Sequence, residues 1–153
     1  MTNFRAISAM TLVGLLAGVA QADPTDAVLQ DGSYEVKVRL ELPNVVNRAA
    51  DKTTTICVAS ADGAKDRPFP VLSTNNPLAK CPARNVRREG ATLSFDILCD
   101  GRGAAKAHAV YTLMPGAFAG RIAMVMGGKN MTMTEVQAGR RIGSCDPASA
   151  AQH

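Results

Sequence analysis

The clearest pattern in the chain is a strict alternation of apolar and polar residues from Ser33 to Leu42. A period of two places successive side chains on opposite faces of a strand, so this segment predicts a strand with one buried face. Pro43 ends the element, and the β-branched run 53–58 predicts a second strand that ends near Cys57. The apolar side of the first strand would carry Tyr34, Val36, Val38, Leu40 and Leu42.

Three turn signals divide the second half of the chain into paired strands. Glu89-Gly90, Pro115-Gly116 and the segment 127–130 separate alternating segments and are rich in turn-forming residues. They predict strands over 83–88, 91–99, 104–114, 117–126 and 131–138. Because no helical period is apparent beyond the first 22 residues, we expect an all-β fold, an antiparallel meander of about seven strands forming a small barrel or sandwich.

Pairing across the last two turns gives the predicted sheet one wholly apolar face. The opposite face carries polar side chains such as Lys106, His108 and Arg121. Antiparallel sheets with one solvated side show this division, so the apolar face is the predicted core. It collects Ala105, Ala107, Ala109, Tyr111, Leu113, Phe118, Gly120, Ile122, Met124, Met126, Met131 and Met133.

The first 22 residues have the three parts of an export signal. Arg5 supplies the positive start, 7–19 the apolar middle, and Ala20-Gln21-Ala22 a small-x-small cleavage site. The apolar stretch is interrupted and falls short of the roughly 18 residues that a membrane span needs. We therefore expect cleavage near Ala22, a periplasmic or secreted protein with no stable membrane anchor, a single β domain over 23–145 and a flexible tail over 146–153.

The four cysteines are expected to form two disulfides, because an exported chain meets an oxidising compartment. Cys57, Cys81, Cys99 and Cys145 are widely spaced, and the lack of a C-x-x-C pair disfavours a zinc or redox site. The turn at Gly90 places Cys81 within reach of Cys99 if a bulge at Pro82 corrects the parity of the first strand. This favours Cys81–Cys99 with Cys57–Cys145, while the sequential pairing Cys57–Cys81 with Cys99–Cys145 stays open.

The segment 59–80 predicts a long loop. It is rich in Pro, Asp, Asn and Ser and shows no periodicity. Loops of this length often carry function, so we treat the segment as a candidate recognition element whose partner the sequence does not name.

The sharpest candidate site is a methionine-rich hairpin. Met124, Met126, Met131 and Met133 form M-x-M on both of its arms, and soft thioethers are ligands that select Cu(I). The favoured interpretation is that these side chains fill the core, where methionine is an adaptable filler. A partly open interior that binds a small apolar molecule is an intermediate possibility.

No catalytic residue is predicted. His108 falls on the polar face without a nucleophile or carboxylate in a recognisable pattern, so a surface role is expected and the chain is expected not to be an enzyme. The net charge of +4 comes from basic residues scattered along the chain, which disfavours nucleic-acid binding.

Several motifs resemble those of one family. They are Asp31-Gly32-Ser33-Tyr34-Glu35-Val36, the Cys81 to Cys99 unit, Met131-Thr132-Met133-Thr134 and Gly139-Arg140-Arg141-Ile142-Gly143-Ser144-Cys145. In these motifs the chain resembles the domain of unknown function 3617 family, small exported proteins of Gram-negative bacteria, although it has Tyr34 where a Trp is frequent. The resemblance implies a periplasmic, disulfide-bearing β domain and brings no known activity, cofactor or catalytic residue.

The sequence thus favours a non-enzymatic periplasmic domain that binds a protein partner or a small apolar ligand and needs no cofactor. The alternative is a periplasmic Cu(I)-binding protein that uses the methionine hairpin.

Overall fold

The computed structural model describes residues 29–43, 51–58, 68–129 and 131–145 of the 153-residue chain. Within these residues the fold is all-β, as predicted, with short 3₁₀ helices η2 (Pro77–Lys80) and η3 (Gly127–Lys129). The strands are β1 (Gly32–Glu41), β2 (Asp51–Val58), β3 (Ala83–Glu89), β4 (Thr92–Leu98), β5 (Lys106–Met114), β6 (Ala117–Val125) and β7 (Thr132–Gly143).

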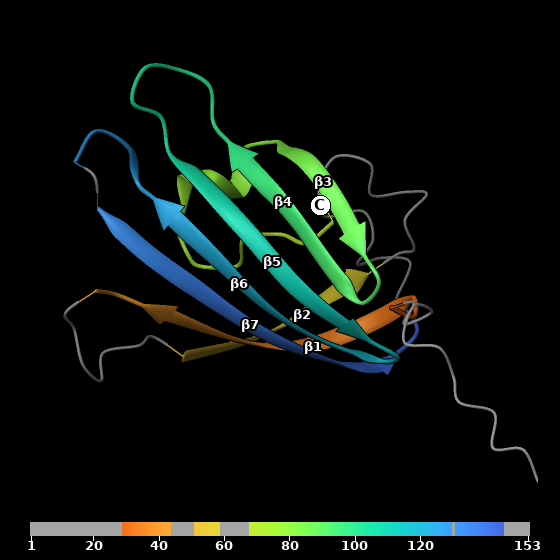
Figure 1. Ribbon diagram of the computed structural model, residues 1–153. Helices are drawn as coiled ribbons and strands as arrows, with labels where there is room; N and C mark the ends of the chain where they lie inside the picture. The colour runs from red at the N-terminus through yellow and green to blue at the C-terminus, as the bar shows by residue number, and fades with distance from the viewer. Residues whose placement is uncertain (1–28, 44–50, 59–67, 130, 146–153) are drawn as a thin grey trace, which may run out of the picture.

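The seven strands of the described residues form one antiparallel sheet with the order β2-β1-β7-β6-β5-β4-β3. The strands from β3 to β7 form the predicted meander, and β7 then lies beside β1 (Figure 1). In the part of the chain that the structure describes, β2 and β3 each have a single neighbour, so the sheet curves without closing. Of the two expected ways of completing the fold, the closed barrel is therefore not the one observed.

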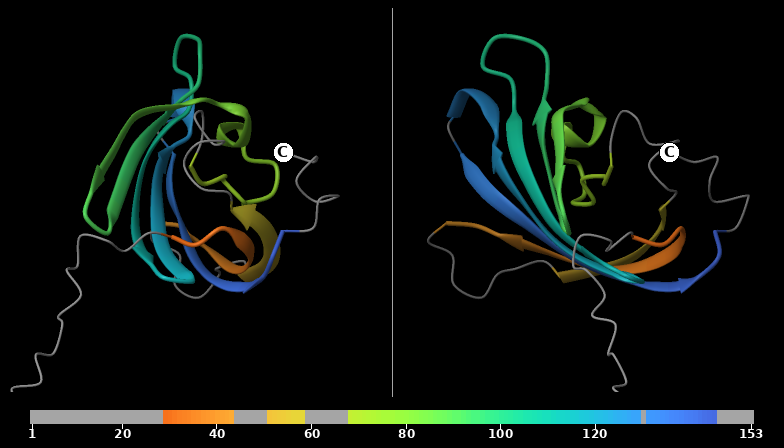
Figure 2. Two further views of the ribbon diagram at one scale, coloured as in Figure 1. Left: turned by 90° about the vertical axis from the view of Figure 1, so that its right-hand side faces the viewer. Right: turned by 45° about the vertical axis from the view of Figure 1, so that its right-hand side comes forward.

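A segment of the chain fills the space on the concave side of this sheet. We call residues 68–80, which include η2, the strap; Figure 2 shows it in yellow-green against the concave side. The chain between β2 and β3 has to travel from one edge of the sheet to the other, and the strap is the described part of that connection. The hydrophobic core lies between the sheet and the strap, and the strap covers the concave face in place of a second sheet.

The strap begins with a bend at residues 68–69 and ends in η2. Asn76 caps η2, since its side-chain oxygen accepts a hydrogen bond from the Leu78 amide, and Pro77 occupies the first turn, where no amide donor is needed. Leu78 is then fully buried. Of the predicted loop 59–80, residues 59–67 lie outside the described residues, and the remainder is part of the core.

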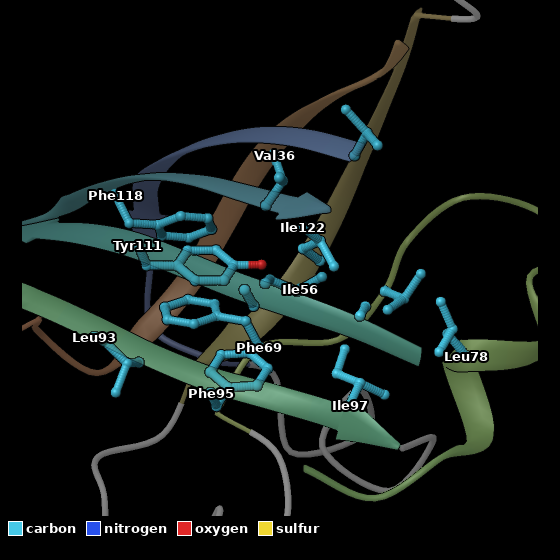
Figure 3. Packing of buried hydrophobic residues seen from close by; sticks show 14 of the residues in the cluster. Val36, Ile56, Phe69, Leu78, Leu93, Phe95, Ile97, Tyr111, Phe118 and Ile122 are labelled. Carbon is cyan, nitrogen blue, oxygen red and sulfur yellow. The ribbon is translucent and has the colours of Figure 1, made fainter. Parts of the chain in front are cut away.

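Aromatic rings dominate the core beneath the strap. Figure 3 shows Phe69 from the strap close to Tyr111 on β5 and Phe118 on β6. Burial alternates along β4, β5 and β6, as the period of two predicted. The apolar face assigned from the sequence is the concave, buried face, except that Met131 is exposed beyond the edge of the core, and each of these rings is almost completely shielded from solvent.

Two disulfides bracket the strap. Cys57 in β2 is bonded to Cys145 after β7, and Cys81 is bonded to Cys99 beside β4. The structure therefore has the pairing that the hairpin register favoured, and not the sequential one. Since Cys57 precedes the strap and Cys81 follows it directly, both ends of the connection are fixed to the sheet.

The hairpin of β3 and β4 departs from regular pairing at a different place from the one predicted. Ala83 lies opposite Ile97, but the register shifts between Arg84 and Arg87 instead of at Pro82. Asn85 adopts a positive φ of 52° within that irregularity. A positive φ is tolerated by Asn better than by most residues, so the irregularity forms where the sequence permits it.

The predicted export signal (1–22) and the predicted tail (146–153) lie outside the described residues. Among the residues that are described, none belongs to a helix of the length and apolar character that a membrane crossing requires.

Candidate functional site

Two polar side chains lie at the centre of the concave face. Glu135 and Gln137 on β7 are both fully buried. They follow Met133 at intervals of two, so the strand's alternation turns them toward the core. Burying a carboxylate costs free energy unless hydrogen bonds compensate. The hydrogen-bond partners of Glu135 therefore indicate what this residue holds in place.

The Glu135 carboxylate holds the strap by its backbone. The Leu72 amide donates to Oε1 and the Ser73 amide donates to Oε2, each over 2.9 Å. The Gln137 side-chain amide also donates to Oε1, over 2.6 Å. Hydrogen bonds to a charged acceptor are stronger than those between neutral groups, so Glu135 is the main polar attachment of the strap.

Gln137 extends this attachment in two directions. Its amide nitrogen donates to the Pro70 carbonyl over 2.9 Å, and its oxygen accepts from the Tyr111 hydroxyl over 3.0 Å. Burial raises the pKa of Tyr111 well above its ordinary value, and the nearby Glu135 charge adds to the effect. The hydroxyl therefore stays protonated and remains a donor.

Side chains of the strap supply the apolar half of the attachment. The Phe69 ring stacks on Tyr111 with centroids 4.2 Å apart and approaches Phe118 with centroids 4.6 Å apart. Val71 is also buried, two residues further along. On the outer side of the strap, Lys52 of β2 donates to the Leu72 carbonyl over 3.1 Å.

The methionine hairpin lies at one end of the same face. Met124 is opposite Met133, and the Met126 amide donates to the Met131 carbonyl over 2.8 Å, so the pairing continues and sets the four residues in two cross-strand pairs. The exposed fraction of these methionines ranges from 1% at Met124 to 54% at Met131. The strap reaches it as well, since the Asn76 amide donates to Met124 Sδ over 3.1 Å.

His108 lies on the convex face, as predicted, but it has a carboxylate partner that sequence reasoning missed. His108 Nδ1 lies 2.8 Å from Asp96 Oδ1, because the two residues are opposite each other on β4 and β5. Asn85 donates to Asp96 Oδ2 over 2.8 Å. The hydrogen bonds from Asn85 and then His108 lower the pKa of Asp96 below its ordinary value.

A hollow of about 380 Å³ lies between the loop after β4 and the loop after β6, and its lining residues include Gly101, Gly103, Lys106 and Gly127. Over the described residues, no group of three or more His, Cys, Asp or Glu side chains is arranged to hold a metal ion. The candidate site is the concave face with its strap, where buried polar side chains meet the strap backbone.

Sequence reasoning also missed Glu135 and Gln137. The signal was available, because the parity that placed Met133 on the apolar face also places Glu135 and Gln137 there. A charged residue at a core position is uncommon and calls for a specific partner, which here is the backbone of the strap.

Fold and site together define a class: a single-sheet, disulfide-bonded β domain whose concave face is covered by a segment of its own chain. The family model described as "Protein of unknown function (DUF3617)" matches residues 29–145, and the chain belongs to this family. Searches of curated proteins and of solved structures found no match.

Proposed function

We propose that this protein is a non-enzymatic binding protein of the periplasm that takes an apolar ligand on its concave face when the strap moves aside. The observation that carries the proposal is the way the strap is held. Residues 70–73 of the strap are attached to β7 by the side chains of Glu135 and Gln137, and the strap is not a strand of the sheet. The strap can therefore separate without breaking any pairing between strands.

The polar attachment also lowers the cost of separation. When the strap lifts, water can hydrate Glu135 and the Leu72 and Ser73 amides, which replaces the hydrogen bonds that are lost. A purely apolar contact has no such compensation. The surface left behind, with Tyr111 and Phe118, would favour an apolar ligand.

The disulfides support the same proposal. Cys57–Cys145 and Cys81–Cys99 fix the chain on both sides of the strap, so the frame keeps its shape while the segment between them moves. They also fit an oxidising compartment, as does the export signal expected over residues 1–22.

A single tryptophan tests the proposal. The chain has no Trp, so Phe69→Trp introduces the only one, at the centre of the strap contact. On titration with palmitate as the apolar probe, we expect red-shifted emission, increased quenching by acrylamide and retained palmitate in native mass spectrometry. Val110→Trp, on the exposed convex face of β5, is the matched control and should not respond. Absence of palmitate binding together with unchanged emission from the Phe69→Trp variant would contradict the proposal.

A second candidate function is Cu(I) binding by the methionine hairpin. The cross-strand array favours it, because directly opposite residues in an antiparallel pair lie about 5 Å apart at Cβ, within reach of flexible thioethers. Competition with a chromophoric Cu(I) chelator should give one Cu(I) per chain and none after Met124, Met126, Met131 and Met133 are changed to Leu. Met114→Leu, at an exposed position on β5, is the control that should keep the metal.

A further inference from the structure

We propose that the free edge of β2 pairs with β2 of a second copy of this chain, so that two seven-stranded sheets join into one across a two-fold axis. This inference goes beyond the proposed function, because it concerns a different surface and needs no movement of the strap. It rests on a contrast between the two strands that have a single neighbour in the described part of the chain, β2 and β3.

The β3 edge carries the features by which proteins block pairing at a free edge. Its register with β4 shifts between Arg84 and Arg87, and Asn85 within that irregularity has a positive φ. A second β3 paired around Val86 would also place Arg84 opposite Arg88, and like charges directly opposite each other are destabilising. Both the irregular pairing and the edge charges oppose the addition of a further strand.

The β2 edge is regular and accessible. Its pairing with β1 runs from one end of the strand to the other without a register shift. Residues 53–58 are uncharged and, apart from Cys57, all β-branched, which is typical of strands. Thr53 and Thr55 are exposed in the middle of the strand. A regular, uncharged edge of this kind is a template for pairing with another chain.

The sequence of β2 is also complementary to itself. Residues that lie opposite each other across the axis share a face of the sheet, and the register centred on Thr54 satisfies this condition over residues 51–57. It places Thr54 opposite Thr54 and Thr53 opposite Thr55, and Thr–Thr pairs stabilise antiparallel strands. Val58 stays outside this pairing, where its carbonyl oxygen lies 4.0 Å from the Cys145 sulfur of its own chain.

The charged residues of β2 do not meet in this register. Asp51 lies opposite Cys57 of the second copy, and Lys52 lies opposite Ile56. The contact is isologous, since each copy offers the same residues, and one such contact completes a two-fold dimer. Because the β3 edges resist pairing, the joined sheet should stop at two copies.

Sedimentation velocity tests the pairing on the protein that lacks the export signal expected over residues 1–22. We expect the mass to rise from that of one chain to that of two as the protein concentration increases. Thr53→Lys with Thr55→Lys places Lys opposite Lys twice and should give a monomer. Thr53→Glu with Thr55→Lys places Glu opposite Lys twice and should restore the dimer. Val86→Lys, on the β3 edge, is the matched control and should dimerise like the unaltered protein.

Circular dichroism establishes that each variant is folded, and Thr54→Cys gives a second test that adds no charge. The substituted positions of the two copies face each other across the axis with Cα atoms about 5 Å apart, a separation that a disulfide spans. Mild oxidation should therefore produce a covalent dimer of Thr54→Cys and not of Val86→Cys.

Three results would overturn the inference. They are a monomer at every concentration of the unaltered protein, a dimer that survives both lysine substitutions, and cross-linking of Val86→Cys as readily as Thr54→Cys.

Discussion

The ring of Phe69 stacks on the ring of Tyr111, with centroids 4.2 Å apart and planes inclined by 14°. One residue belongs to the strap and the other to β5, 42 positions further along the chain by their numbers, so this contact joins the two layers of the core. Tyr111 in turn donates to Gln137, which holds the Pro70 carbonyl. The apolar and polar attachments of the strap therefore meet at Tyr111.

Replacing Phe69 should remove the apolar attachment. We expect Phe69→Ala to lower the free energy of unfolding by about 3–5 kcal/mol, since truncating a buried aromatic leaves a cavity. Urea denaturation measures the change. Val86→Ala on the exposed edge strand β3 is the control and should change stability by less than about 0.5 kcal/mol. A loss equal to that of Val86→Ala would mean that the strap contributes little to the core.

Replacing Glu135 should loosen the strap selectively. Glu135→Ala leaves the Leu72 and Ser73 amides without their acceptor, and each buried unsatisfied amide costs about 1–3 kcal/mol. We expect these two amides to lose protection in hydrogen exchange while the amides of β5 and β6 keep theirs. Glu35→Ala, which removes an exposed ion pair with Arg140, is the control and should change stability by at most about 1 kcal/mol. Uniform loss of protection across the sheet would contradict a selective role.

The sequence predicts the strands where their side chains alternate and fails where local pattern does not determine the outcome. Tyr34, Val36 and Val38 are buried as predicted, because one buried face imposes the period of two. The strand predicted over 131–138 ends short of the observed end of β7 at Gly143. The alternation along β7 assigns Glu135 and Gln137 to the buried face, but the hydrogen bonds that compensate their burial come from the strap, about 65 residues away in sequence, and no local pattern encodes these partners.

The sequence predicts the strap as part of an irregular loop and a candidate recognition element, not as a buried segment. Phe69 and Val71 alternate over too few residues to indicate a buried segment, and the contact with Tyr111 exists only because the connection has to cross the sheet. The same crossing explains why the sheet does not close into a barrel: strap residues fill the concave side, so β2 and β3 remain edges within the described part of the chain.

Asp96 should make stability depend on pH in the acid range. Its pKa is lowered in the folded protein, first by the hydrogen bond from Asn85 and then by that from His108. A lowered folded-state pKa stabilises the fold above the unfolded-state pKa of about 3.9, and the contribution is lost as pH falls through the folded value. Asn85→Gly removes the amide donor and tolerates the positive φ of 52° at this position. NMR titration should show the pKa of Asp96 rise in the variant; an unchanged pKa would contradict the assignment.

The two disulfides should differ in their contribution. In the chain-entropy description, a cross-link stabilises by about 2–4 kcal/mol and more for a longer loop. Cys57–Cys145 closes a separation of 88 residues and Cys81–Cys99 one of 18. We expect removal of the first by paired Ala substitutions to cost about 1 kcal/mol more than removal of the second. Thermal unfolding of the two variants measures the difference, and the opposite order would show that local strain or residual structure in the unfolded chain governs these bonds.

Gly120 should be essential to the site because Tyr111 lies directly over it. The two residues are opposite each other on β6 and β5, and a Cβ at Gly120 would overlap the Tyr111 ring. Gly120→Ala therefore forces the ring to move, which disturbs both its stacking on Phe69 and its hydrogen bond to Gln137. We expect a loss of about 1–3 kcal/mol in unfolding free energy, as for other overpacked cores.

Gly128→Ala is the matched control, since a Cβ there meets no atom within 4 Å. In the Phe69→Trp background, Gly120→Ala should also red-shift the emission of the introduced tryptophan while Gly128→Ala leaves it unchanged; equal spectra would mean that the strap does not depend on the position of Tyr111.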